Sequence, residues 1–310
     1  MTMLPETPSP VRKPAPRSTH TYGAVILMTV FWSLNYIAAK FALRSFPPIL
    51  YACLRMILAG AMMFVTYLVW ARHRPQAVIS KWPRRDLLIL AVIGVLGMVG
   101  NQILFVAGLG RTSVAHASLV IATTPVQVLL LAWIRGQERL TGLKISGMAM
   151  AIGGIGVLNL SPGRSARGAS LMGDALIFLC AFSFALYSVL GKERMKRFGA
   201  IPVNALGFGI SAVLLLVPVW FMGRDFNYAA VPAMGWWMLA YMAGISSVLC
   251  YIIYSTALET LPASRVASFS YAQPFIACLA AWWLLGEPVT LPVALGGMLV
   301  LGGVWLTGRG

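Results

Sequence analysis

Long apolar stretches make up most of the chain, and short polar segments separate them. Each stretch is close to the roughly 20 residues with which an α-helix crosses a hydrocarbon core about 30 Å thick. Apolar and polar residues do not alternate with period two within the stretches, which disfavours a membrane β-barrel. The pattern predicts ten membrane-spanning helices, at about residues 21–43, 48–71, 86–108, 112–134, 141–160, 172–193, 200–222, 234–257, 263–285 and 290–308.

The composition supports this pattern. Of the 310 residues, 59% are hydrophobic and only 10% are charged, and the mean hydropathy is +0.81. A soluble domain carries about 25% charged residues, so we expect an all-α integral membrane protein. The four cysteines, Cys53, Cys180, Cys250 and Cys278, lie in separate apolar stretches without CxxC or Cys/His spacing. We therefore expect neither a metal site nor a cofactor.

The net charge of +16 is distributed unevenly between the two sides of the predicted bundle. Seventeen lysines and arginines fall on the side of the N-terminus and five on the other side. Because positive loops stay in the cytoplasm, we expect both termini there, and no nucleic-acid partner. Residues 1–20 contain five prolines and few apolar residues, which predicts a disordered cytoplasmic tail.

Two parts of the chain repeat each other at a shift of 149 residues. Residues 114–154 align with residues 263–303, so that Pro125 matches Pro274 and Glu138 matches Glu287. This predicts two five-helix repeats, at residues 21–160 and 172–308. Because five is an odd number, the second repeat is inverted in the membrane relative to the first, an arrangement typical of secondary transporters.

Polar residues in the apolar stretches fall on common helical faces at about 100° per residue. Such residues in a membrane either line a cavity or mediate helix packing, and both roles stay open for each of them. The candidate substrate-binding residues are Trp32, Ser33, Tyr36, Lys40, Arg55, Asn101, Gln102, Thr123, Ser183, Tyr187, Tyr251, Tyr254, Ser268 and Tyr271.

The repeated residues are candidates for conformational roles. Pro125 and Pro274 each remove a helix hydrogen bond in mid-span, which produces either a static kink or a bending point. Glu138 and Glu287 stand at the ends of their spans, where we expect them to cap or to gate rather than to bind substrate.

Charged residues inside the spans are few. All eight acidic residues fall in the tail, in loops or at span ends, so the sequence offers no carboxylate of the kind that proton-coupled exporters of cations use. Lys40 can reach the outer interface by extending its side chain. Arg55 lies about 10 Å below the outer end of its span, where it pairs with carbonyl groups or attracts a substrate carboxylate. His116 lies near the outer end of the fourth span, where we expect a hydrated structural residue, with a proton carrier as the alternative.

The segment FWSLNYIAAK in the first span, Arg55 early in the second, and the two P…E-x-x-T…G blocks resemble the drug/metabolite transporter superfamily of the EamA type. Length and aromatic content look most like YddG-type bacterial exporters of aromatic and other neutral amino acids. The resemblance covers nearly the whole chain after residue 20. It implies ten helices in two halves, and a central cavity lined by spans 1, 3, 4, 6, 8 and 9.

The residues and the resemblance together predict a secondary exporter of small amphipathic metabolites in the bacterial inner membrane, working as a monomer by alternating access. Aromatic side chains would stack on the substrate, and amides and hydroxyls would hold its polar end. Two alternatives within the superfamily are a phosphorylated-sugar or nucleotide-sugar exchanger, using Lys40, Arg55 and Arg265, and a cationic-drug/proton antiporter. A membrane sensor is the alternative outside transport. No HExxH, GxSxG or GxxxxGK[ST] motif occurs, so we expect no enzyme and no nucleotide-driven pump.

Overall fold

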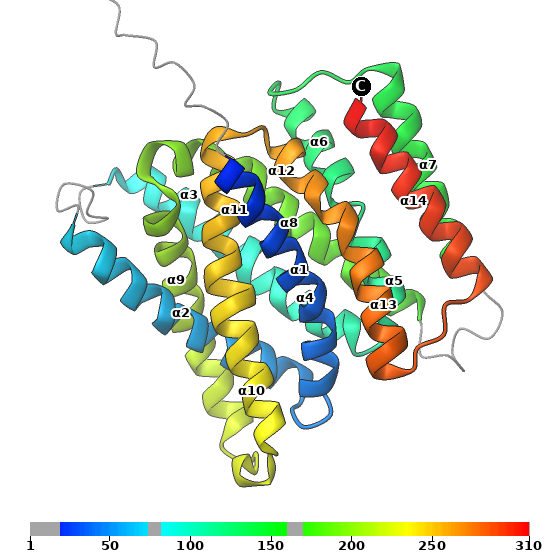
Figure 1. The fold of residues 1–310 in the computed structure, drawn as a ribbon. Coiled ribbons are helices and arrows are strands. Elements are labelled where there is room, and N and C mark those ends of the chain that lie inside the picture. The colour runs from blue at the N-terminus through cyan, green and yellow to red at the C-terminus, as the bar shows by residue number, and fades with distance from the viewer. Residues whose placement is uncertain (1–18, 74–81, 160–169, 310) are drawn as a thin grey trace, which may run out of the picture.

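The computed structural model describes residues 19–73, 82–159 and 170–309, and within these ranges the regular structure is entirely helical (Figure 1). The predicted disordered tail falls almost wholly on residues 1–18, which lie outside the described part of the chain. In chain order the elements are α1 (Thr19–Ala42), α2 (Pro48–Arg72), α3 (Arg84–Gly94), the π-helix η2 (Val95–Gly100), α4 (Asn101–Leu109), α5 (Val114–Ile121), α6 (Thr124–Ile134), α7 (Gly142–Asn159), α8 (Leu171–Phe198), α9 (Ala200–Gly223), the 3-10 helix η4 (Tyr228–Ala230), α10 (Ala233–Tyr241), the π-helix η5 (Met242–Leu249), α11 (Cys250–Thr260), α12 (Ala263–Ser268), the 3-10 helix η6 (Phe269–Ala272), α13 (Gln273–Leu285) and α14 (Leu291–Arg309).

The helices have the length and surface of membrane spans. Among the described residues, seven continuous helices are long and apolar enough to cross a bilayer, and three shorter apolar helices cover Gly142–Val157, Phe269–Leu285 and Leu291–Thr307. Large apolar side chains face outward, including Trp220 at 71%, Trp237 at 70% and Trp283 at 77% exposure. Hydrocarbon chains can cover such a surface and water cannot do so favourably. The chain is therefore a multi-pass membrane protein.

Four of the predicted spans consist of more than one helical segment. Span 86–108 contains α3, η2 and α4, and span 234–257 contains α10, η5 and α11. Span 112–134 is divided between α5 and α6, and span 263–285 between α12, η6 and α13. Pro125 and Pro274 stand in the first turns of α6 and α13. A proline has no N–H to donate to the preceding turn, so the helix ends before each of them and a new segment begins.

Glycines allow close helix packing on both sides of the bundle. A side chain at Gly94 would place its Cβ atom 2.9 Å from Gly207 Cα, so α3 and α9 can touch only without one. The same holds where α7 crosses α14, because a Cβ atom at Gly303 would lie 2.5 Å from Gly147 O. These small-residue contacts are typical of helix pairs in membranes.

The helices form one bundle with a distinct centre and two edges (Figure 1). The pair α7 and α14 lies at one edge, and α2 packs along α9 on the other side. Between them stand α1, α4, α8, α11 and α13, which contact one another. The two described chain ends, at the start of α1 and the end of α14, lie toward the same end of the bundle. This arrangement leaves the middle of the bundle to the polar faces of the central helices.

Candidate substrate-binding site

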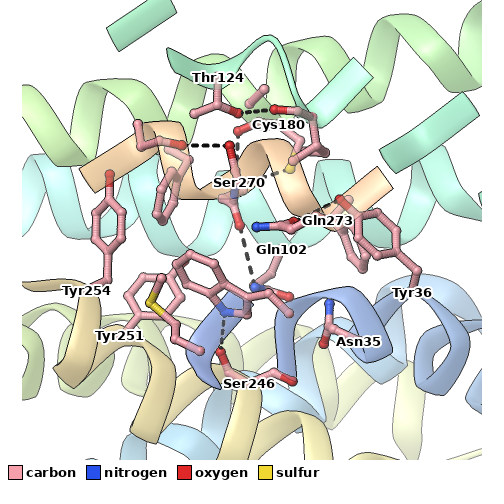
Figure 2. Close-up of a pocket in the computed structure, with 18 of the residues that line it drawn as sticks. Asn35, Tyr36, Gln102, Thr124, Cys180, Ser246, Tyr251, Tyr254, Ser270 and Gln273 are labelled. Atoms are coloured by element: carbon pink, nitrogen blue, oxygen red, sulfur yellow. Dashed lines mark hydrogen bonds between the residues drawn. The ribbon is translucent and has the colours of Figure 1, made fainter. Parts of the chain in front are cut away.

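The central helices enclose a cavity of about 90 Å3 in the middle of the bundle (Figure 2). Segments of seven predicted spans contribute to it, namely spans 1, 2, 3, 4, 6, 8 and 9. Its aromatic residues are Trp32, Tyr36, Phe105, Phe184, Tyr251 and Tyr254, and its polar residues are Asn35, Arg55, Asn101, Gln102, Thr124, Cys180, Ser246, Ser270 and Gln273. Met28, Ile121, Ala181, Val266 and Ala267 complete the lining.

One wall of the cavity is aromatic. The Trp32 ring lies 5.6 Å from the rings of both Phe184 and Tyr254, and 6.1 Å from that of Tyr251, measured between centroids. Trp32 Nε1 donates a hydrogen bond of 2.9 Å to Ser246 O, which joins α1 to the π-helix η5. These contacts fix the indole in place, so the wall offers a rigid apolar surface for another ring or an aliphatic chain.

The opposite side of the cavity carries amides. Figure 2 shows Tyr36 across from Tyr251 and Tyr254, with Gln102 between them. Asn101 Nδ2 donates to Cys180 O at 3.0 Å, and Tyr36 Oη donates to Gln273 Oε1 at 3.5 Å. These bonds connect α1, α4, α8 and α13 around the cavity, and they orient several donors and acceptors toward one small volume.

Arg55 brings a positive charge to this cavity. The residue is 1% exposed, and its Nε donates to Ser247 Oγ at 3.1 Å. Its NH1 nitrogen has no hydrogen-bond partner, and none of the ion pairs among the described residues includes it. Asn35 Oδ1, on the same cavity, also lacks a partner. A buried charge without a counterion costs several kcal/mol, so the site is electrostatically incomplete.

Half of the sequence-predicted binding residues meet in this cavity. They are Trp32, Tyr36, Arg55, Asn101, Gln102, Tyr251 and Tyr254. The side chain of one further candidate, Ser268, lies outside the described part of the structure.

The remaining candidates lie elsewhere. Ser33 Oγ donates to Thr29 O and Thr123 Oγ to Val120 O, each within its own helix turn. Tyr187 Oη donates to Asn204 Oδ1 at 2.7 Å, in a polar contact that joins α8 to α9.

Three candidates contact other parts of the bundle. The Ser183 hydroxyl faces the π-helix η2 at Gly100. Tyr271 packs against a small apolar cluster formed by Ala122, Val126, Ala151 and Val300. Lys40 Nζ donates to Thr112 O at 2.7 Å near the end of α1.

Several lining residues were not predicted, and most of them stand next to a helix break. Thr124 lines the cavity in place of its neighbour Thr123, and Ser246 of the π-helix η5 also lines it. A constant 100° per residue fails where the chain passes from α5 to α6 or through the wide turns of η5. Ser270 and Gln273 lie at the boundary between η6 and α13, where the same error arises. The helical pattern could have found Asn35, which lies one turn from Trp32 in α1, and Phe105, which lies one turn from Asn101 in α4.

The repeated glutamates make corresponding contacts at the two ends of the bundle. Glu287 Oε2 accepts a hydrogen bond of 2.9 Å from Val114 N, at the start of α5. Glu138 Oε1 accepts one of 2.9 Å from Ser264 Oγ, at the start of α12. Each glutamate follows one of the proline-broken spans and holds the beginning of the other. The two contacts thus connect the two broken spans reciprocally.

A buried pair of ionisable side chains lies outside the cavity. His116 Nδ1 is 3.0 Å from Asp174 Oδ2, and the two side chains are only 5% and 4% exposed. The expectation that His116 is hydrated is therefore wrong. The sequence places His116 near the end of its span, where water would normally reach it. In the structure the first turn of α8 covers the side chain, which the sequence position alone does not reveal.

Comparisons with known proteins agree with this architecture. The sequence model of the EamA-like transporter family matches residues 21–160 and again residues 171–309. An "Uncharacterized transporter" of Archaeoglobus fulgidus is 28% identical, over 92% of this chain and 98% of its own length. YoaV of Bacillus subtilis, an "Uncharacterized transporter", is 22% identical over 91% and 94%. YedA of Escherichia coli, an "Uncharacterized inner membrane transporter", is 26% identical over 87% and 84%.

A protein of known crystal structure has the same fold. The match has a TM-score of 0.67 and covers 94% of this chain and 98% of the other, with 20% sequence identity. At this identity the likeness concerns the fold alone.

Proposed function

Because the chain belongs to the EamA-like transporter family, we propose that this membrane transporter exports small amphipathic metabolites, with aromatic and neutral amino acids as its substrates. The substrate would bind in the central cavity, between two inverted repeats of five spans with both termini in the cytoplasm. The name of the relative YedA supports a place in the bacterial inner membrane.

The proposal rests on a donor and acceptors that lack hydrogen-bond partners inside an aromatic cavity. Arg55 NH1 is a cationic donor without an acceptor, and Asn35 Oδ1 is an acceptor without a donor. Gln102 Oε1 and Ser246 Oγ, in the same lining, also lack partners. A zwitterionic amino acid supplies a carboxylate for the guanidinium and an ammonium for the amide oxygens. Its side chain would lie against the aromatic wall formed around Trp32.

Alternating access would use the two broken spans. The halves of each span can change their mutual angle where the helix is interrupted before Pro125 and before Pro274. Release of the contact between Glu287 and Val114 would free one end of the cavity, and release of the contact between Glu138 and Ser264 the other. An inverted repeat makes these two movements equivalent, which is why such folds suit transport.

The alternatives fit the cavity less well. A phosphorylated sugar or a nucleotide sugar needs several cations, and Arg55 is the one cation in the described lining. Lys40 binds Thr112 O outside the cavity, and the side chain of Arg265 lies outside the described part of the structure. A cationic drug needs a carboxylate, and the described lining contains none.

Uptake into liposomes tests the proposal. The purified protein would be reconstituted, and the entry of radiolabelled phenylalanine, threonine and methyl viologen measured with and without a proton gradient. We expect amino-acid flux and no viologen flux. Competition separates the two polar contacts, since phenethylamine lacks the carboxylate and 3-phenylpropionate lacks the ammonium. Both should inhibit phenylalanine uptake at least about tenfold less well than phenylalanine itself, which corresponds to the loss of one charge-assisted contact of about 1.4 kcal/mol or more.

Two results would contradict the proposal. Viologen flux without amino-acid flux would make the protein a cation exporter. Equal inhibition by phenethylamine and phenylalanine would show that no carboxylate is recognised, and would remove the role assigned to Arg55.

A further inference from the structure

The buried pair of His116 and Asp174 is not needed for binding in the cavity. Asp174 Oδ2 faces His116 Nδ1, and Asp174 Oδ1 accepts a hydrogen bond of 2.5 Å from Thr112 Oγ. The pair joins the first turn of α5 to the first turn of α8. This is the end of the bundle where α1 ends, which faces outward in the predicted topology. A buried ionisable pair inside a transporter is a candidate ion site by chemistry alone.

The pair belongs to a set of contacts that holds the start of α5. Lys40 Nζ of α1 donates to Thr112 O at 2.7 Å, and Glu287, after α13, accepts from Val114 N at 2.9 Å. The helix α5 has eight residues and is separated from α6 by the break before Thr124. It can therefore move as a unit when these contacts release. Its last residue, Ile121, lines the cavity.

The carboxyl group of Asp174 faces several hydrogen-bond donors. It lies in the first turn of α8, where the helix dipole favours a negative charge. Hydrogen bonds from Thr112 and from the His116 ring add to that preference. Since the carboxylate only accepts, His116 Nδ1 carries a hydrogen and donates it. The other ring nitrogen, Nε2, is then the atom that can take up a proton.

The remaining charged groups near the first turn of α5 have opposite signs, so their effects on the charge of His116 oppose each other. Lys40 from α1 and Glu287 from beyond α13 stand at its first turn with opposite signs. Arg111, which follows α4, is exposed and donates to Ala107 O. On α13, the thiol of Cys278 lies 3.9 Å from Ser118 Oγ. The elements α7 and α14 also pack against α5, and their charged residues Lys144 and Arg309 stand where α7 begins and α14 ends, at the opposite end of the bundle.

We propose that His116 and Asp174 form the proton-binding site of this exporter and couple substrate export to proton entry, an inference that rests on the proposed transport function. When the cavity is open to the outside, His116 Nε2 takes one proton from the outer water. The resulting imidazolium attracts the Asp174 carboxylate more strongly than the neutral ring does, and this draws α5 onto α8 and closes the outer side. Once the cavity opens to the cytoplasm, the proton leaves to the inner water and substrate binds.

Two transport assays on the same liposomes separate coupling from transport. Exchange of labelled for unlabelled phenylalanine needs no net proton movement. Accumulation driven by a pH gradient, with the membrane potential clamped at zero, requires it. A gradient of about one pH unit supports up to about tenfold accumulation for one proton per substrate. We expect His116→Gln and Asp174→Asn to keep exchange and lose accumulation, and the control His73→Gln, on an exposed residue at the end of α2, to keep both.

Titration of the imidazole provides a second measurement that needs no substrate. The chain has three histidines, so replacing His20 and His73 leaves His116 as the single signal in an NMR spectrum of 15N-histidine-labelled protein. We expect the ring signals to change with pH as Nε2 takes up a proton, and to change differently in Asp174→Asn, because that substitution removes the charge that faces the ring.

Each outcome decides for or against the site. Gradient-driven accumulation by His116→Gln at the wild-type level overturns the inference. So does wild-type protein that exchanges phenylalanine without any response to the gradient, which leaves the proposed function intact. If no amino acid is exchanged, the proposed function fails. In that case, or if His116→Gln loses exchange as well, the titration decides, and a ring that does not titrate overturns the site.

Discussion

Replacement of Arg55 by methionine should change stability and substrate binding in opposite directions. The side chain is 1% exposed, makes one hydrogen bond, to Ser247 Oγ, and leaves NH1 without a partner. Methionine has a similar length and carries no charge. The substitution therefore removes the unpaired buried charge while it keeps most of the packing around α2 and η5.

The magnitude follows from the two contributions that the charge makes. Loss of the bond to Ser247 costs about 1.5–3 kcal/mol, the range for hydrogen bonds to charged groups. Removal of a buried ion without a counterion returns a desolvation penalty of several kcal/mol. The sum of the two effects should raise the free energy of unfolding of the unliganded protein by about 1–3 kcal/mol. Binding of the substrate carboxylate should weaken by about 2–5 kcal/mol, or roughly 30-fold to several thousand-fold in Kd.

Thermal unfolding in detergent, followed by tryptophan fluorescence with and without phenylalanine, measures both effects. Arg44→Met is the matched control, because Arg44 is exposed and lies over the Phe41 ring at 4.6 Å. The control should leave phenylalanine binding unchanged. An Arg55→Met protein that unfolds at a lower temperature than wild type, and still binds phenylalanine, would show that Arg55 is a satisfied structural residue.

Three further predictions concern the helix contacts. Gly303→Ala should lower the free energy of unfolding by about 1–3 kcal/mol, because the new Cβ atom would lie 2.5 Å from Gly147 O. The control Gly153→Ala, whose Cβ atom would have no atom within 4 Å, should leave the free energy of unfolding unchanged in the same assay. In a variant that keeps Cys180 as its one cysteine, the access of an impermeant maleimide to the cavity can be measured from each side. Glu287→Gln should raise the reactivity of Cys180 from outside, and Glu138→Gln should raise it from the cytoplasmic side. Unchanged reactivity in both variants would exclude a gating role for the glutamates. Asn204→Ala should destabilise by about 1–3 kcal/mol, seen as a lower unfolding temperature, since Asn204 bonds Tyr187, Ser255 and Ala200 O.

The cavity residues show where helical periodicity predicts the correct side chains and where it does not. Trp32 and Tyr36 were found because α1 is an unbroken helix there, so that their spacing places them on one face. The prediction of Thr123 was one residue in error, because Thr123 stands beside the break before α6 and Thr124 lines the cavity instead. The proline that marks a break is visible in the sequence, but the rotation that the break introduces is set by the helices packed around it.

Arg55 and Asp174 illustrate the same limit for charged residues. The sequence placed Arg55 inside the membrane and left its partner open, and only the packed bundle shows NH1 facing a cavity without an acceptor. Asp174 counted as a residue at a span end, where water would normally cover it. The tertiary structure buries it against His116, because α5 and α8 meet at their first turns.

The sequence by itself determined that the chain is a helical membrane protein with a duplicated half, since hydropathy, segment length and the 149-residue shift are properties of the chain alone. These properties depend on neighbouring residues and on the solvent. Which polar side chains face one another depends on contacts between helices that are far apart in the chain. The cavity around Arg55, the reciprocal contacts of Glu138 and Glu287, and the buried pair of His116 and Asp174 were therefore decided only by the tertiary structure.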